Sequence, residues 1–250
     1  MTAQCEAAIR KGVQQIAFTE HEDYNSGDMT SFFFKHDAYL EEVARCRERY
    51  DGQLVIRAAI EVSEPHEYAE AAGAVLRKHD WDFVLGSLHW IQPGIDTCKE
   101  SFMTYAGDWR QSFRNYFTQM ISLARDGDFD ILSHIDYPSR YNRHIHAGAY
   151  DITAYEDIIR EVLRNVIARG RGIEINTSPW RKGLVNPNPP AVVVKWYREM
   201  GGEILTLGSD SHAPKDVGAD IDRAMAMAKD AGFTRIAVFE RRKPAFVRID

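Results

Sequence analysis

The sequence has few cysteines, no long hydrophobic run and no excess of positive charge. Its three cysteines are scattered, which argues against a disulfide framework or a cysteine-based zinc site and is typical of a reduced, cytoplasmic protein. No apolar run approaches the roughly 18 residues that a membrane-spanning helix needs. Residues 1–12 resemble an amphipathic helix, so we expect no signal peptide. The net charge of −6 at pH 7 argues against a nucleic-acid partner, and the lack of a long apolar run argues against a membrane partner.

The order of the predicted elements indicates an α/β fold. The 250 residues, 44% of them hydrophobic, can form a single domain over 1–250. Short β-rich runs alternate with helix-like stretches, which predicts a parallel sheet closed into a β/α barrel. The expected strands are 15–20, 54–62, 83–88, 130–134, 172–177, 203–208 and 235–239, and the expected helices are 2–12, 37–50, 65–79, 108–126, 152–169, 190–200 and 215–231. Because a barrel normally begins on a strand, its first strand is expected to be absent here.

Six of the predicted strands end in a side chain that can bind a metal ion. Because strand C-termini meet at one face of a β/α barrel, these side chains are expected to converge. Three carboxylates and four imidazoles around one point imply metal ions, and this donor set suits Zn, Mn or Fe. The residues are His21, Glu61, His89, His134, Glu174, Asp210 and His212.

Taken in order, the motifs TEH, IEV, GSLHW, SHID, EINTS and GSDSH resemble the polymerase and histidinol phosphatase (PHP) family of metal-dependent phosphoesterases. The stretches AFTEHED, LSHIDYPSRY, EINTSPWRKG and LTLGSDSHAPKDVG are similar to its histidinol-phosphatase branch. The resemblance covers nearly the whole chain. It implies a distorted, TIM-like (β/α)7-type barrel with up to three metal ions, and a phosphomonoesterase acting on histidinol phosphate in histidine biosynthesis.

The resemblance also assigns roles to individual residues. Glu61 matches a carboxylate that bridges two ions, and His89 and His134 complete the second site with it. Asp210 matches a first-site ligand, and these four residues form the expected catalytic set. The full set of expected metal ligands, whose first and last members match the third site, is His21, Glu61, His89, His134, Asp210 and His212.

One family motif has no counterpart in the sequence. An H-x-H that ends the family's first strand is absent ahead of the predicted strand 15–20. A missing segment of about 15–25 residues before Met1 would account for this, and true divergence to a one-metal or inactive protein is the alternative. The H-x-H at 144–146 is expected on the surface, in a loop well after a strand end. We therefore expect fewer than three ions and weak turnover from the chain as it stands.

The phosphate of the substrate needs cationic anchors, and an arginine can bind two of its oxygens at once. Arg140 or Arg143 follows one ligand-bearing strand, and Arg181 follows another. The resemblance implies that arginines in these two loops bind phosphate. Glu174, at a strand end, could hold a cationic substrate group or orient a histidine, and the acidic loop 20–23 could attract the amine and imidazole of histidinol.

Other functions stay open from the sequence. One is a PHP phosphoesterase of different small-molecule specificity, such as a nucleotide or sugar phosphatase. Another is a degenerate metal-binding protein without activity. A metal-dependent amidohydrolase is less favoured because no predicted strand ends in a lysine. The expected partner is a small phosphomonoester, and the sequence leaves the oligomeric state open.

Overall fold

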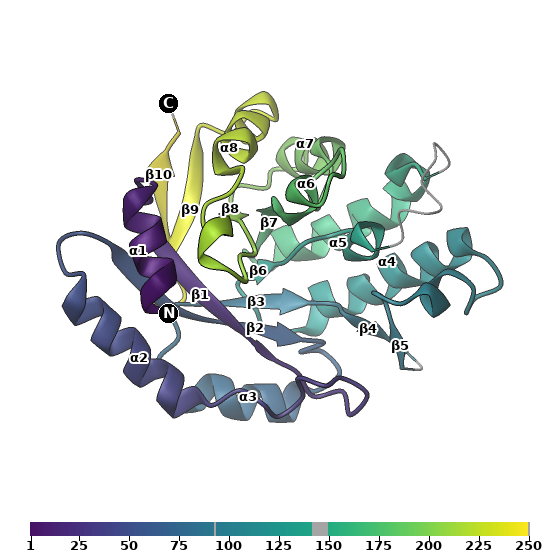
Figure 1. Ribbon diagram of the computed structural model, residues 1–250. Helices are drawn as coiled ribbons and strands as arrows, with labels where there is room; N and C mark the ends of the chain where they lie inside the picture. Colours follow the sequence, from purple (N-terminus) through teal and green to yellow (C-terminus); the bar gives the residue numbers. More distant parts are fainter. Residues whose placement is uncertain (93, 142–149, 250) are drawn as a thin grey trace.

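The computed structural model describes residues 1–92, 94–141 and 150–249, and it is built around one curled sheet (Figure 1). The sheet has six strands in the order β1-β2-β3-β6-β7-β8, and all neighbouring pairs are parallel. The strands are Gln15–Glu22 (β1), Val55–Ser63 (β2), Phe83–Ser87 (β3), Ile131–Leu132 (β6), Gly172–Asn176 (β7) and Leu205–Gly208 (β8). The order follows the chain, as expected for successive β/α units.

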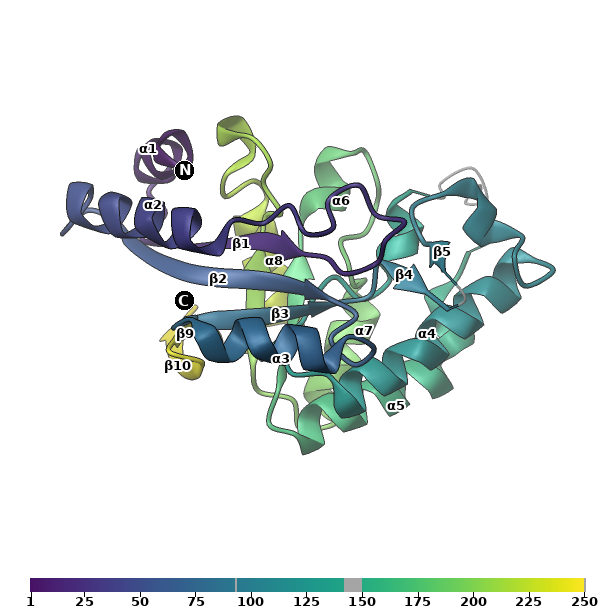
Figure 2. The ribbon, with the colours of Figure 1, turned by 90° about the horizontal axis from the view of Figure 1, so that it is seen from below.

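Helices follow most of the strands and cover the outside of the sheet, with α2 and α3 beside β1 to β3 (Figures 1 and 2). The helices are Thr2–Arg10 (α1), His36–Arg49 (α2), Ala69–Lys78 (α3), Trp109–Asp126 (α4), Glu156–Ala168 (α5), Ser178–Arg181 (α6), Ala191–Glu199 (α7) and Ile221–Asp230 (α8). Short 3₁₀ turns are Glu100–Met103 (η1), Tyr137–Arg140 (η2), Ile152–Tyr155 (η4) and Pro214–Asp216 (η5). Among the described residues, no helix is long and apolar enough to cross a membrane.

Helix α2 shows how side-chain spacing attaches a helix to the sheet. Its buried residues Tyr39, Val43 and Cys46 recur at helical spacing, so they form one apolar face. The hydroxyl of Tyr39 lies 2.6 Å from the carbonyl oxygen of Phe18 on β1 and 3.1 Å from that of Ala59 on β2. The helix is thereby held against both strands, and the β1–β2 pair is held with it.

The structure confirms the predicted α/β barrel-type fold, with two differences. The sheet does not close, because β1 and β8 are its edges, so it forms a half-barrel. The last expected strand forms as Arg235–Glu240 (β9), but it pairs antiparallel with Lys243–Arg248 (β10), outside the parallel sheet. The expectation of a seventh parallel strand was therefore wrong. A two-residue turn at 241–242, with positive φ at both residues, reverses the chain into this hairpin.

The β9–β10 hairpin lies at the N-terminal end of the sheet, near the start of β3 (Figure 2). The backbone N–H of Arg242 donates to the carbonyl of Asp82, 2.7 Å away, just before β3. Its guanidinium donates to Asp130, just before β6, at 3.0 Å, and to Asp128 at 2.6 Å. Asp130 is 2% exposed, so its negative charge is stable only with such partners.

A second small hairpin, formed by Trp90–Ile91 (β4) and Ile95–Asp96 (β5), follows β3 in the chain.

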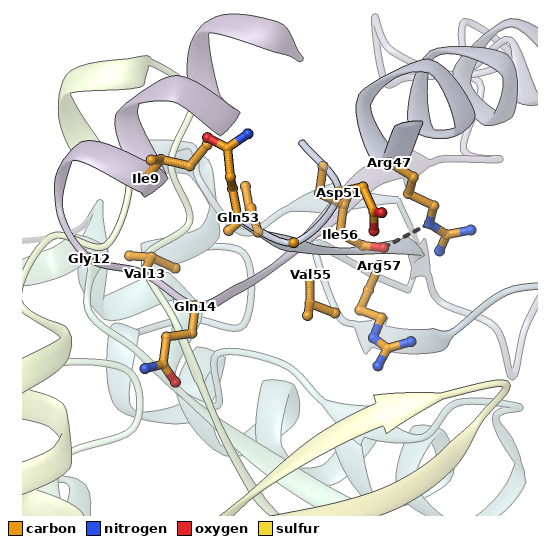
Figure 3. Close-up of a pocket in the computed structure, with 12 residues that line it drawn as sticks. Ile9, Gly12, Val13, Gln14, Arg47, Asp51, Gln53, Val55, Ile56 and Arg57 are labelled. Atoms are coloured by element: carbon orange, nitrogen blue, oxygen red, sulfur yellow. Dashed lines mark hydrogen bonds between the residues drawn. The ribbon is translucent and has the colours of Figure 1, made fainter. Parts of the chain in front are cut away.

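A hollow of about 690 Å³ lies at this N-terminal end, between α1 and the start of β2 (Figure 3). Its lining residues, among them Ile9, Gln14, Val55 and Arg57, precede or begin β1 and β2. The strand ends that carry the predicted metal ligands lie at the opposite end of the sheet. The hollow is therefore separate from the candidate site.

We predict that Arg242→Ala lowers the free energy of unfolding by about 1–3 kcal/mol, because a buried carboxylate loses charged hydrogen bonds. Urea unfolding followed by circular dichroism measures this. The control is Lys243→Ala, which removes an exposed cation from the same hairpin and should leave stability unchanged. Equal losses in the two variants would show that the docked turn contributes nothing beyond general charge.

Candidate metal centre at the strand C-termini

Four predicted ligands meet at the C-terminal ends of four neighbouring strands. The β1–β2 register pairs His21 directly with Glu61, while His89 and His134 follow the ends of β3 and β6. The Nε2 atoms of His134 and His89 lie 2.9 and 3.3 Å from Glu61 Oε1. The Nε2 of His21 lies 3.8 Å from Glu61 Oε2. One carboxylate is thus faced by three imidazole nitrogens, and the structure brings these four predicted ligands together.

The spacing and burial of this cluster suit a metal ion. Three potential ligand atoms lie within 4.8 Å of one another, one each from His21, Glu61 and His89. The side chains of Glu61, His89 and His134 are at most 9% exposed, whereas that of His21 is 38% exposed. The cluster is therefore shielded on the sheet side and reaches solvent beside β1. Imidazole nitrogens and a carboxylate at this spacing fit a divalent transition ion.

Serine hydroxyls hold the central carboxylate in place. Ser87, the last residue of β3, donates to Glu61 Oε1 at 2.5 Å, and its Oγ lies 2.8 Å from the Oγ of Ser133. Ser133 follows β6, so this pair of hydroxyls links two strand ends beneath the carboxylate. Glu61 keeps its second oxygen, Oε2, on the His21 side.

The charges in the cluster shift its pKa values. Burial alone would raise the pKa of the Glu61 carboxyl, but the charge of His21 and the hydrogen bonds of His134 and His89 hold that pKa well below its usual value. For His21, burial works against the charged form, yet Glu61 and Asp23 raise its pKa to about 9. Burial dominates at His134 and lowers its pKa to about 4. A negatively charged Glu61 is the favoured state of the site.

Asp210 and His212 lie beside the cluster, on the loop after β8. Asp210 has a left-handed backbone, with φ of 49°. Its Oδ2 lies 2.6 Å from the Nη1 of Arg140, whose side chain is 3% exposed. Arg140 also donates to Asn176 Oδ1 at 3.1 Å. His212 Nδ1 lies 3.4 Å from Asp210 Oδ1, with its side chain 77% exposed. Arg140 thus neutralises the predicted ligand Asp210.

The other predicted substrate-binding residues have different surroundings. Arg181 donates to the carbonyl oxygens of Ser209 and Asp210, both at 2.5 Å, and its side chain is 20% exposed. Glu174 Oε2 accepts from the backbone N–H of His134 at 3.2 Å. Burial and the negative charges of Glu61 and Asp210 raise the pKa of Glu174 to about 7. Arg143 and the H-x-H at 144–146 lie outside the described residues.

The acidic segment 20–23 corrects one expectation. It was predicted as a loop that attracts substrate, but β1 continues to Glu22, and Glu22 and Asp23 are 6% and 3% exposed. Asp23 Oδ2 lies 3.6 Å from the Nδ1 of His21. Ser63 donates to Asp23 and lies 2.9 Å from the Nδ1 of His89. Asp23 and Ser63 thus lie beside the Nδ1 atoms of two predicted ligands, and each follows a predicted ligand by two residues, a spacing that could have identified them.

Two further residues, Glu64 and Tyr137, lie near the predicted ligands, and no motif in the sequence indicated a role for them at the site. Glu64 Oε1 accepts from the backbone N–H groups of His89 and Trp90, at 2.6 and 3.0 Å, and Glu64 itself has a φ of 47°. The ring of Tyr137 lies 4.5 Å from that of His134 and 4.8 Å from that of His89. Their proximity to the site arises only when the loops after β2 and β6 are folded.

Comparisons with known proteins agree with this geometry. A family model for the PHP domain matches residues 1–178. A protein of Clostridium acetobutylicum named "Probable histidinol-phosphatase" is 32% identical over 241 residues, covering 95% of this chain and 91% of that protein. A histidinol-phosphatase of Lactococcus lactis is 23% identical over 249 residues, covering 94% of this chain and 87% of that protein.

The fold is also shared with a solved structure. This is the crystal structure of histidinol phosphate phosphatase from Lactococcus lactis, complexed with zinc, L-histidinol and phosphate. The superposition has a TM-score of 0.82 at 22% sequence identity and covers 98% of this chain and 92% of the other. At that identity the likeness establishes the fold.

Gly208, the last residue of β8, leaves room for Glu174. An added Cβ would lie 1.9 Å from Glu174 Oε1, so we predict that Gly208→Ala displaces this carboxylate and lowers the free energy of unfolding by about 1–3 kcal/mol. Urea unfolding measures the loss. The control is Gly73→Ala in α3, whose methyl would meet only the movable guanidinium of Arg77 at 2.8 Å; it should be neutral or stabilising. A Gly208→Ala protein as stable as wild type would contradict this packing.

Proposed function

The chain belongs to the PHP domain family, and from that premise we propose that it is a metal-dependent phosphomonoesterase that hydrolyses histidinol phosphate. The observation that carries the proposal is the convergence of three imidazole Nε2 atoms on the two oxygens of buried Glu61. The names of the relatives support histidinol phosphate as the substrate. We place the reaction in histidine biosynthesis, and in the cytoplasm, where the three free cysteines would stay reduced.

The donor set fits divalent transition ions. Glu61 offers Oε1 to the side of His89 and His134 and Oε2 to the side of His21, so it can be shared between two ions. We propose Zn, Mn or Fe as the ion, with Asp210 and His212 as further ligands near the cluster. When bound, such ions supply positive charge to the phosphate oxygens and make a water molecule a stronger nucleophile at neutral pH.

The two described arginines differ in their suitability as phosphate anchors. Arg140 is almost fully buried and uses its donors on Asp210 and Asn176. We propose that it positions Asp210 and meets the phosphate only if that pair opens. Arg181 is more exposed, and its hydrogen bonds to the carbonyl oxygens of Ser209 and Asp210 leave some of its five N–H groups available. Arg181 is therefore our preferred anchor, and Arg143 stays a proposal from the sequence.

Glu174 is proposed as a positioning group for His134 rather than as a direct contact with the substrate cation. Its Oε2 accepts hydrogen bonds from the backbone N–H of His134 and from the side-chain amide of Asn176, the latter at 3.3 Å.

The alternatives to the proposed function are a different small phosphomonoester as substrate, or a metal-binding protein without turnover. Metal binding together with a substrate panel separates these cases.

We predict that Glu61→Gln abolishes turnover and weakens metal binding, because it removes the charge and the carboxylate that face all three imidazoles. The assay is phosphate release from histidinol phosphate against sugar and nucleotide monophosphates, with Mn or Zn supplied, beside metal analysis of the purified protein. Glu70→Gln, on the exposed face of α3, is the control and should behave as wild type. A higher kcat/KM for another panel member would reject the proposed substrate, and a wild-type protein that binds no metal would reject the proposed class.

Arg181 is expected to contribute more to substrate binding than to the chemical step. Arg181→Ala should raise KM about 10-fold or more with a smaller effect on kcat, since it removes a charged contact made in both the bound and transition states. Arg181→Lys should recover only part of the loss, because an ammonium cannot form the two-point contact. Steady-state kinetics at fixed metal concentration measure both variants. An unchanged KM in Arg181→Ala would remove this residue from the binding site.

A further inference from the structure

One buried carboxylate, that of Asp23, faces the Nδ1 atoms of two proposed metal ligands, His21 and His89. Its Oδ2 lies 3.6 Å from His21 Nδ1, and its Oδ1 lies 4.0 Å from His89 Nδ1. Ser63 bridges the longer gap, since its hydroxyl donates to Asp23 Oδ1 and lies 2.9 Å from the same His89 Nδ1. The opposite nitrogens of both rings, the Nε2 atoms, face Glu61. Each imidazole therefore lies between two carboxylates.

The strand register produces this arrangement. His21 and Glu61 are paired across β1 and β2. Ser63 ends β2 and Asp23 directly follows β1, two positions beyond Glu61 and His21, so the two residues form the next layer above the His21–Glu61 pair. Asp23 is 3% exposed and Ser63 is 1% exposed. A buried carboxylate in this layer needs hydrogen-bond donors, and the nearby Nδ1 atoms are suited to supply them.

The hydrogen-bond roles around His89 follow from counting protons. A carboxylate can only accept, so the single proton of the Ser63 hydroxyl points to Asp23. The Ser63 oxygen then accepts from His89 Nδ1, which must carry a proton. At His21, Nδ1 faces the Asp23 carboxylate at 3.6 Å, and the negative charge of that carboxylate favours a proton on Nδ1. When a cation takes the place of a proton on Nε2, the Nδ1 proton of His21 stays directed at Asp23 and that of His89 stays on the hydrogen bond to Ser63.

We infer that Asp23 is a positioning residue that holds His21 directly, and His89 through Ser63, in the Nδ1–H tautomer, so that both Nε2 lone pairs point at a cation beside Glu61. This inference rests on the metal site of the proposed function. A hydrogen bond to the far nitrogen of a metal-bound histidine orients the ring and increases its affinity for the ion. Here one carboxylate lies beside two proposed ligands, one on β1 and one just after β3.

Asp23 also has a contact that points to a simpler role. The hydroxyl of Thr30 lies 2.6 Å from both Asp23 Oδ2 and Asp28 Oδ1, and the backbone N–H of Phe32 donates to the Asp23 carbonyl at 3.3 Å. These bonds tie down the loop that follows β1. The test must therefore separate tautomer control from loop anchoring, and Thr30→Val does so because it removes a loop bond and leaves the carboxylate.

The experiment compares Zn²⁺ binding by wild type, Asp23→Asn, Ser63→Ala and Thr30→Val, using competition with a chromophoric chelator. Asp23→Asn should weaken Zn²⁺ binding about 10- to 100-fold, because an amide can donate to Nδ1 and so favours the tautomer with a proton on Nε2. Ser63→Ala should cause a smaller loss. Thr30→Val should bind as wild type, as should Glu22→Gln, a buried carboxylate whose partner is His36 outside the cluster.

The second readout is the tautomer itself, from ¹⁵N–¹H correlation spectra of the Zn²⁺-loaded protein labelled at histidine. In wild type we expect His21 and His89 to carry a proton on Nδ1 and to bind Zn²⁺ through Nε2. Ser63→Ala should alter the His89 signals and leave those of His21 unchanged, which a general loss of structure would not do.

Wild-type affinity and tautomers in Asp23→Asn would overturn the inference, as would an equal loss of affinity in Thr30→Val. If Asp23→Asn does not fold, Ser63→Ala decides, and unchanged His89 signals in that variant would overturn it. A wild-type protein that binds no Zn²⁺ would instead reject the proposed metal site, so the two failures are distinguishable.

Discussion

A carboxylate inside a protein is stable only where its neighbours replace the water that it has lost, and Glu61 imposes this constraint on the site. Its charge is supported by three imidazoles and by the Ser87 hydroxyl. These groups come from β1, β3 and β6 or the residues that follow them. An isolated buried charge would be costly. The charge of Glu61 therefore requires the strand ends to meet, and it leaves imidazole nitrogens arranged around a point where a cation can replace protons.

The buried carboxylates at the two ends of the sheet have different kinds of partner. At the N-terminal end, Asp130 is matched by Arg242 and by Arg171, whose Nη1 lies 2.7 Å from its Oδ1. Those guanidinium groups carry permanent charge, so the pairs are complete and structural. At the C-terminal end, Glu61 is faced by histidines, which can lose a proton and bind a metal instead. The buried carboxylates at one end of the sheet are thus paired with permanent cations, and the one at the other end faces side chains that can exchange protons.

Much of the fold and of the site could be predicted from the chain alone. The alternation of short apolar runs and helical stretches predicted all six strands of the parallel sheet, because strand burial and helix amphipathicity are local patterns. The antiparallel pairing of β9 with β10 was missed, because it depends on a turn of two arginines, Arg241 and Arg242, at positive φ. Non-glycine residues rarely adopt this conformation, and here the turn docks on Asp82 and Asp130.

The sequence by itself determined which potential metal-binding side chains lie at which strand ends, since a side chain that follows a parallel strand has only one end of the sheet to occupy. His21, Glu61, His89 and His134 could be identified in this way. Only the tertiary structure decided what lies behind and between them. The β1–β2 register places Asp23 and Ser63 behind two imidazoles, and the packing of loops brings Arg140 onto Asp210. These contacts join residues tens of positions apart, and their geometry depends on strand register and loop packing, which no local pattern encodes.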